Sequence, residues 1–407
     1  MGLKILITNN TLASRAGTEL YVRDIAVALL RRGHTPIAYS TLLGEVAQEL
    51  RRATVPVIDH LDALATPPDI IHGHHHLETM TALLKFPGVP AISFCHGWNP
   101  WEEAPPKFPR IRRYIAVDEA CRDRLVHENG IPDAAVRLLP NFVDLNRFKP
   151  RNSLPDRPAR ALVFSNYVTE RGLGPIQEAC FRAGIEVDAV GSGLGKPTSR
   201  PEDVLPKYDL VFAQGRSAIE ALAVGTAVIL WNTRGAGSMV TTGNIERLRR
   251  LNFGIRTIQG ATDSENVSQE IARYNAFDAM QAPSWIRRTA GLDDALDRLL
   301  DLYNEVLEDY HRYRMDDNRA EIRAASDYLR QWVPNLTAQQ EARMRHEALR
   351  VECDALRSEL DALRRENHNV ARVYSSPTLR LRNRLVAIPL LGPVLRSCAR
   401  FVAGRMS

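Results

Sequence analysis

The chain has 407 residues, of which 44% are hydrophobic and 25% charged, so it can build two or three domains with substantial cores. Its five cysteines are odd in number and widely spaced, without a Cys-x-x-Cys pair, which argues against a disulfide scaffold or a zinc site. The net charge of +5 is modest, the first residues pass directly into a strand, and no apolar run reaches the length of a membrane span, so neither secretion nor a transmembrane helix is expected.

The first part of the chain alternates strand-like and helix-like segments. It begins with a buried strand at 3–8 and an amphipathic helix at 17–34, and further strands are predicted at 35–40, 68–73, 89–94, 113–117 and 136–140. This alternation is typical of βαβ units around a parallel sheet. We therefore predict a Rossmann-like, doubly wound domain over residues 1–150.

A segment rich in proline and arginine, 149–160, predicts a linker to a second α/β domain over 151–282. The strands expected there lie at 161–165, 184–190, 208–213 and 226–231. Ligands of such sheets bind at the carboxyl ends of the strands, beside helix N-termini. Two facing domains of this kind would form a cleft between them.

The chain becomes helical and charged after residue 284, and a heptad pattern predicts a coiled coil over 336–370. Glu352 would face Arg357 of a parallel partner, and Glu359 would face Arg364. This pairing favours a homodimer through residues 342–370, and a single helix lying on the domain surface is the alternative. The d positions are Ala342, Leu349, Leu356, Leu363 and Val370, and the a positions are His346, Cys353, Leu360 and Asn367.

The tail, residues 371–407, contains seven arginines among apolar residues and no acidic residue. Basic amphipathic segments bind anionic membrane surfaces, so we expect a peripheral protein on the inner, cytoplasmic face of a membrane. A disordered, solvated tail is the alternative. Nucleic acid is not expected as a partner, because the tail has few aromatic residues on which bases could stack.

Four segments resemble retaining glycosyltransferases of family 4, which have the GT-B fold. They are "ITNNTLASRAGTELYVRDIAVALLRRGH" (7–34), the stretch 114–150 that leads into the linker, "EALAVGTAVI" (220–229), and "PSWIRRTAGLDDALDRLLDLYNEVL" (283–307). The resemblance covers about residues 1–310. It implies that 283–335 form closing helices that cross back to the first domain.

The resemblance also implies an activity, namely transfer of a sugar, of the hexosyl class, from a UDP- or GDP-linked donor to a glycan or lipid-linked acceptor, with retention. Polysaccharide biosynthesis is the implied setting, and no metal or other cofactor is expected. The sequence agrees in having no Asp-x-Asp triplet of the kind that holds a cation against a diphosphate. A catalytically degenerate scaffold protein and a nucleotide-sugar epimerase are the alternatives.

Glu220 is the main candidate for donor binding. The resemblance implies that its carboxylate accepts hydrogen bonds from the ribose hydroxyls, whereas the pattern Ser217-x-x-Glu220 alone predicts a capping box at a helix start. The family's other glutamate is replaced by Phe212, so Gln214 is a candidate substitute. The backbone amides of Gly215, Arg216 and Ser217 are further candidates for the donor site.

For the donor phosphates, the resemblance points to Asn166 and Arg171, of which Arg171 alone carries charge. A solvated arginine at a helix start is the alternative for Arg171. On the first-domain side, Gly17 is expected to let backbone amides approach the diphosphate or the acceptor.

Histidines form the last group of candidates. His96 follows a strand end and matches a family histidine beside the donor sugar, which makes it the catalytic candidate. In "HGHHH", His72, His74 and His76 would share one face of a strand, but no set of cysteines or carboxylates completes a zinc site. We expect His74 or His75 to line the cleft.

Overall fold

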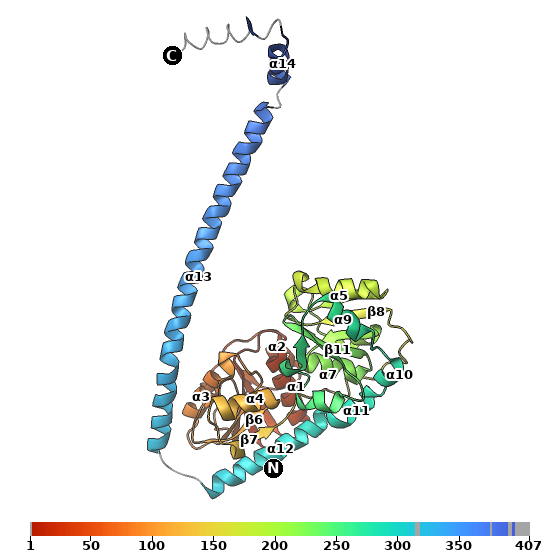
Figure 1. The fold of residues 1–407 in the computed structure, drawn as a ribbon. Coiled ribbons are helices and arrows are strands. Elements are labelled where there is room, and N and C mark those ends of the chain that lie inside the picture. The colour runs from red at the N-terminus through yellow and green to blue at the C-terminus, as the bar shows by residue number, and fades with distance from the viewer. Residues whose placement is uncertain (1, 314–317, 375–376, 390–392, 395–407) are drawn as a thin grey trace. The chain divides into compact units, whose positions relative to one another are not determined.

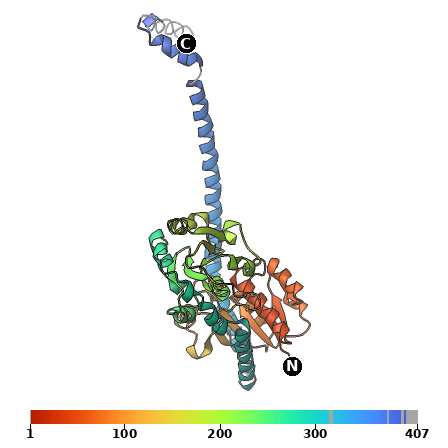
Figure 2. The same ribbon diagram turned by 90° about the vertical axis from the view of Figure 1, so that its right-hand side faces the viewer.

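The computed structural model describes residues 2–313, 318–374, 377–389 and 393–394. The chain divides into two units, Met1–Ala325 and Ser326–Ser407, which are described separately. The first unit contains two α/β domains, coloured red to orange and green in Figure 1 and seen from a second direction in Figure 2.

The first domain is built on a seven-stranded parallel sheet in the order β3-β2-β1-β4-β5-β6-β7. One of its interior strands is apolar at Ile5, Leu6 and Ile7, which are fully buried because helices cover both faces of the sheet. The strands are β1 (Lys4–Thr8), β2 (Thr35–Tyr39), β3 (Val57–Ile58), β4 (Ile70–His74), β5 (Ala91–Cys95), β6 (Ile111–Ala116) and β7 (Val136–Leu138), and the helices are α1 (Gly17–Arg31), α2 (Glu45–Arg52), α3 (His76–Lys85) and α4 (Glu119–Asp123).

The second domain has a six-stranded sheet in the order β13-β12-β11-β10-β8-β9. Strands β8 to β11 are parallel, and β12 and β13 add an antiparallel edge. The strands are β8 (Arg160–Phe164), β9 (Glu186–Val190), β10 (Leu210–Ala213), β11 (Ala227–Asn232), β12 (Gly235–Met239) and β13 (Ile258–Gly260). The helices are α5 (Glu170–Arg182), α6 (Pro201–Val204), α7 (Gly215–Val224), α8 (Ile245–Arg250), α9 (Ser264–Ile271), α10 (Ala276–Ala279) and α11 (Ala282–Thr289). The predicted pair of doubly wound domains is confirmed.

The antiparallel edge was not predicted, and two local features explain it. The Oδ1 of Asn232 accepts hydrogen bonds from the backbone N–H of Arg234 at 2.7 Å and of Gly235 at 3.1 Å, which closes a tight turn after β11. In β12, a Cβ on Gly235 would lie 2.5 Å from the Gly260 carbonyl oxygen. The glycine strand therefore packs against β13 more closely than strands with side chains would allow.

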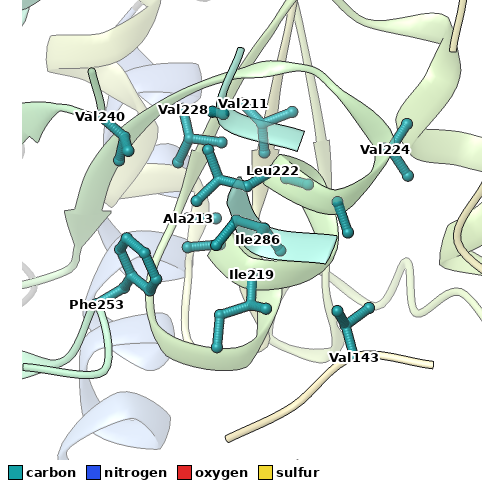
Figure 3. Close-up of a cluster of buried hydrophobic side chains, with 14 of the residues drawn as sticks. Val143, Val211, Ala213, Ile219, Leu222, Val224, Val228, Val240, Phe253 and Ile286 are labelled. Atoms are coloured by element: carbon teal, nitrogen blue, oxygen red, sulfur yellow. The ribbon is translucent and has the colours of Figure 1, made fainter. Parts of the chain in front are cut away.

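The core of the second domain follows the twofold alternation of its strands. Val211 and Ala213 of β10 face a cluster with α7 and α11, whereas Leu210 and Phe212 face α5 and α9 on the other side of the sheet. Figure 3 shows the first of these clusters, in which Ile219 and Leu222 of α7 lie close to Ile286 of α11. Helix α7 is thus held between the sheet and α11, which fixes the position of its N-terminus.

After α11 the chain returns to the first domain through α12 (Leu292–Arg312), seen in cyan along that domain in Figure 1. At the crossing, the Val143 N–H donates to the Ala290 carbonyl at 2.9 Å, and the Leu292 N–H donates to the Val143 carbonyl at 3.0 Å. Helix α12 packs on α1, β5 and β6. Its Tyr303 is fully buried and hydrogen-bonds the Nδ1 of His72.

Helix α13 (Asn318–Tyr374) runs without a break from the predicted closing helices (283–335) into the predicted coiled coil (336–370). Helix α14 (Pro377–Val386) follows it. Leu349, Leu356 and Leu363 at the predicted d positions are 59%, 57% and 55% exposed in the single chain. In the part of the chain that the structure describes, no helix combines the length and the apolar character needed to cross a membrane. Residues 395–407 of the predicted basic tail lie outside the described residues.

Candidate functional site

A cleft of about 570 Å³ lies between the two domains of the first unit. The first domain contributes the start of α1 at Gly17 and the loop His96–Pro100 after β5. The second domain contributes the loop Ser165–Tyr167 after β8, the start of α7 at Gly215–Ser217, and the turn Asn232–Arg234 after β11. These segments follow the carboxyl ends of parallel strands, which is where ligands bind in sheets of this type.

The N-termini of two helices open into this cleft. Helix α1 begins at Gly17 and α7 begins at Gly215, and the preceding Ala16 and Gln214 make no side-chain hydrogen bond to the helix starts. A Cβ on Gly17 would meet no atom within 4 Å, so the space in front of α1 is open. Gly215 has a φ of +58°, a left-handed conformation that favours glycine. Both helix ends can therefore direct N–H groups and positive dipole ends at an anion.

The capping box predicted for Ser217 and Glu220 is wrong. Helix α7 starts at Gly215, with Gln214 as the residue before it, so Ser217 is the third helical residue and Glu220 lies in the second turn. The helix starts earlier because Gly215 supplies the left-handed turn and its N–H donates to the Phe253 carbonyl at 2.8 Å. Ser217 still lines the cleft, together with Gly215 and Arg216.

Glu220 does not line the cleft and is only 5% exposed. Its Oε1 accepts a hydrogen bond from the Nε of Arg216 at 2.9 Å. Burial raises the pKa of Glu220, although the Arg216 guanidinium opposes this shift. Arg216 therefore lines the cleft, and Glu220 contacts its guanidinium from the protein interior.

Arg216 also joins the two domains. Its Nη2 pairs with Asp24 of α1, which is buried and accepts from Arg23 of the same helix through Oδ1. Burial alone would raise the pKa of Asp24, but the guanidinium groups of Arg216 and Arg23 outweigh it and lower that pKa. A cation of the second domain thus lies between a carboxylate of its own helix and a carboxylate of the first domain.

Asn166 lines the cleft and likewise contacts both domains. Its Nδ2 donates to the Arg15 carbonyl at 3.2 Å, and its Oδ1 accepts from the Ser192 hydroxyl at 3.0 Å. The side chain of Arg171, the predicted phosphate partner, lies outside the described residues. The glycine-rich turn at 190–195 is explained by packing, because a Cβ on Gly191 would lie 1.8 Å from the Ser165 carbonyl oxygen.

Gln214 lines the cleft, and its Oε1 accepts from the Nδ2 of Asn232 at 2.8 Å. Phe212 is fully buried within β10 and belongs to the core cluster on the α5 side of the sheet. Phe212 occupies the position at which the resembled family has a glutamate, and its side chain lies in the core and not in the cleft.

The histidines form a stacked array behind the cleft. His96 lines the cleft, and its Nε2 lies 2.8 Å from the Nδ1 of His74. His74 is completely buried and stacks on His72 with ring centroids 4.5 Å apart. His74 therefore contacts His96 from the interior of the domain and does not itself line the cleft. His75 lines an adjoining cavity.

The expectation that His76 shares a strand face with His72 and His74 is wrong. Strand β4 ends at His74, His75 turns the chain with a φ of +63°, and His76 begins α3. Within the described residues, no group of three or more His, Cys, Asp or Glu side chains is arranged to hold a metal ion.

Three carboxylates that were not predicted as ligands lie at the first-domain side of the cleft. Glu19, Glu102 and Glu103 line a cavity of about 470 Å³ that adjoins the cleft. Glu19 lies in the first turn of α1, where the helix dipole favours a carboxylate. Glu102 and Glu103 follow the carboxyl end of β5 in the segment "HGWNPWEE". Their place after a strand end is the sequence feature from which they could have been predicted as site residues.

We predict that His96→Asn flattens the pH dependence of stability below pH 6.5. Burial lowers the pKa of His96 to about 4, so the unfolded chain takes up a proton first and stability falls as the pH drops from 6.5 towards 4. Between pH 7 and pH 5 this histidine contributes a loss of about 2 kcal/mol. Urea unfolding at pH 7 and pH 5 measures the difference. The exposed His127→Asn is the control, and an equal slope in both variants would contradict the prediction.

Residues 15–147 match the model of Glycosyltransferase Family 4. A glycosyltransferase from Rickettsia africae ESF-5 superposes with a TM-score of 0.55 at 15% identity, covering 75% of this chain and 99% of that one. Anabaena HepE (Alr3699) in complex with UDP-glucose gives a TM-score of 0.53 at 15% identity, covering 74% of this chain and 100% of that one.

The same Anabaena protein in complex with UDP and glucose gives a TM-score of 0.52 at 14% identity. No curated protein matches the sequence significantly. At these identities the likeness to solved structures shows the fold, and the family match covers the first domain. The chain therefore has the GT-B fold of these glycosyltransferases, and its first domain is similar to Glycosyltransferase Family 4.

Proposed function

We propose that the protein transfers a hexosyl group from a UDP-linked sugar to a hydroxyl of a glycan or lipid-linked acceptor. The observation that carries this proposal is the convergence of two helix N-termini and the Arg216 guanidinium on one interdomain cleft. Such a combination suits a diphosphate, because all three groups carry positive charge or donate hydrogen bonds. The choice of UDP is supported by the Anabaena protein of the same fold, solved with UDP and with UDP-glucose.

The donor would lie on the second domain, with its phosphates at Arg216 and Asn166 and at the amides of Arg216 and Ser217, since the Gly215 amide already donates to Phe253. We propose that this charge is neutralised without a metal ion. The sugar would face His96, whose pKa is lowered by burial to about 4, so the ring is neutral near pH 7 and can exchange a hydrogen bond with a sugar hydroxyl.

The reaction proposed for the retaining mechanism takes place on one face of the sugar. The bond between the anomeric carbon and the β-phosphate oxygen breaks, and its electron pair leaves with UDP. The acceptor oxygen bonds to the anomeric carbon on the same face, and its proton passes to the departing phosphate. The protein would contribute positioning and electrostatic stabilisation of the developing phosphate charge.

Two further candidate functions have structural observations in their favour. A scaffold protein without activity is favoured by the engagement of Glu220 with Arg216 and by the burial of Phe212. A nucleotide-sugar epimerase is favoured by the three carboxylates, Glu19, Glu102 and Glu103, beside the cleft. Formation of a free epimer from the donor in the absence of an acceptor would indicate the latter.

We also propose that the C-terminal region attaches the enzyme to a membrane as a dimer. The exposed leucines of α13 and the charges beside them suit a parallel partner helix. On α14, Arg380, Arg382 and Arg384 are exposed, and Leu381 is 59% exposed. This combination suits the anionic inner face of a membrane, which would place the active site near a lipid-linked acceptor.

The donor site is tested by thermal unfolding with UDP, GDP, ADP and CMP. We predict that UDP alone stabilises the wild type, by about 2.7 kcal/mol at a hundred times its dissociation constant. Glu220→Gln removes the charged partner of Arg216 and should weaken UDP binding about tenfold. The exposed Glu246→Gln in the same domain is the control. No shift with any nucleotide would overturn the proposed transfer and favour the scaffold, whereas a full shift in Glu220→Gln would leave that residue out of donor binding.

The dimer is tested by a pair of substitutions on α13. Leu356→Asp at a d position should give a monomer by light scattering, because it places a charge in the helix interface. Val351→Asp, at an exposed f position of the same helix, should leave the dimer intact. In a parallel dimer the two Cys353 thiols face each other, so diamide should oxidise them to a disulfide, and Cys353→Ser should prevent this. A monomeric wild type would contradict the prediction.

Membrane attachment is tested by co-sedimentation with vesicles. The full chain should bind vesicles that contain phosphatidylglycerol and not vesicles of phosphatidylcholine alone. Replacing Arg380, Arg382 and Arg384 by Gln should weaken binding about a hundredfold, since each arginine near the surface contributes about 1 kcal/mol. Equal binding to both kinds of vesicle would contradict an electrostatic attachment.

A further inference from the structure

The cavity of about 470 Å³ beside the cleft is the feature that carries an inference beyond donor binding. It shares Gly17, His96 and Arg216 with the donor cleft, so a ligand in it would adjoin the sugar to be transferred. Apart from Tyr167 of the second domain, its remaining lining comes from the first domain, chiefly from the loop after β1, the start of α1 and the loop after β5.

Glu19 is the most unusual residue of this cavity. It lies in the first turn of α1 and is only 3% exposed. Its Oε2 accepts a hydrogen bond from the Thr18 hydroxyl at 3.0 Å, and no arginine or lysine of the described chain forms an ion pair with it. A carboxylate buried without a cation needs hydrogen-bond donors, and the other carboxylate oxygen has capacity for them.

Other residues add further hydrogen-bond acceptors to the cavity. The side-chain Oδ1 of Asn10 is buried and has no hydrogen-bond partner among the described residues. Glu102 adds a second carboxylate without an ion pair in the described chain. Glu103 differs, because it accepts from the His96 N–H at 2.8 Å and lies 3.5 Å from the Nε2 of His75.

The charge balance follows from these contacts. Three carboxylates face the cavity, and the cation nearest to Glu103 is the imidazole of His75 when it is protonated. Arg216 adds a positive charge, but Asp24 and Glu220 already pair with it. The cavity is therefore rich in negative charge and in acceptors, whereas the adjoining cleft is rich in donors.

We propose that this cavity binds the acceptor end as an uncharged sugar, with Glu19 and Asn10 accepting hydrogen bonds from its hydroxyl groups, and that it rejects acceptors bearing a carboxylate or phosphate there. A neutral sugar supplies donors for these acceptors, while an anionic group would be brought beside Glu19 and Glu102, and the nearby Arg216 and His75 already pair with other carboxylates. This inference rests on the proposed transfer reaction and names the class of its acceptor.

The experiment compares matched pairs of ligands on the UDP-saturated protein. Binding of the methyl glycosides of glucose and galactose is measured by saturation-transfer NMR, beside that of the corresponding methyl glucuronide and galacturonide. We expect a neutral glycoside to bind about tenfold or more tightly than its uronide. Glu19→Gln should weaken the neutral glycoside about tenfold through loss of a charge-assisted hydrogen bond, and should reduce the discrimination against the uronide.

The matched control is Glu45→Gln, an exposed carboxylate in the first turn of α2. It loses the same helix-dipole interaction as Glu19→Gln without touching the cavity, so neither sugar should bind differently. Binding of UDP should be unchanged in both variants. Preference for a uronide, no binding of any neutral glycoside, or an unaltered pattern in Glu19→Gln would overturn the inference, whereas loss of UDP binding in the wild type would instead overturn the proposed function.

Discussion

The buried guanidinium of Arg216 is the interaction on which the interdomain site depends. It lies between Glu220 of its own helix and Asp24 of the first domain, and together with Arg23 it stabilises two carboxylates that burial would otherwise destabilise. Removing one partner of such a set leaves an uncompensated buried charge, which costs several kcal/mol. The closed arrangement of the domains and the positive charge of the cleft therefore have the same origin.

This arrangement divides the cleft by charge. On the second-domain side, the start of α7 and Arg216 present donors and positive potential, which suits phosphate. On the first-domain side, Glu19 and Glu102 present acceptors, which suits hydroxyl groups. The neutral ring of His96 lies where the two regions meet, and it is held by His74 from the core of the sheet. Each side of the cleft is thus suited to one of two chemically different ligands.

The sequence predicted the fold well, because uninterrupted apolar strands alternating with amphipathic helices leave few alternatives to a parallel sheet. It missed β12, whose glycines and turn at Asn232 have no hydrophobic periodicity. The site was predicted less completely. The role assigned to Ser217 depended on the start of α7, which the conformation of Gly215 places three residues earlier, with Gln214 and not Ser217 before the helix. The pairing of Arg216 with Asp24 depends on a contact between the domains that no local pattern contains.

The crossing at Val143 has a consequence for motion. The chain passes between the domains twice, and the two passages lie side by side, joined by hydrogen bonds between Val143 and the segment Ala290–Leu292. One flexible linker would allow the domains to twist, slide and bend independently. Two connecting segments that are hydrogen-bonded to each other favour a hinge rotation about one axis and resist twisting and sliding of the domains. The cleft therefore opens mainly by one rotation of the domains, and the same rotation admits both ligands.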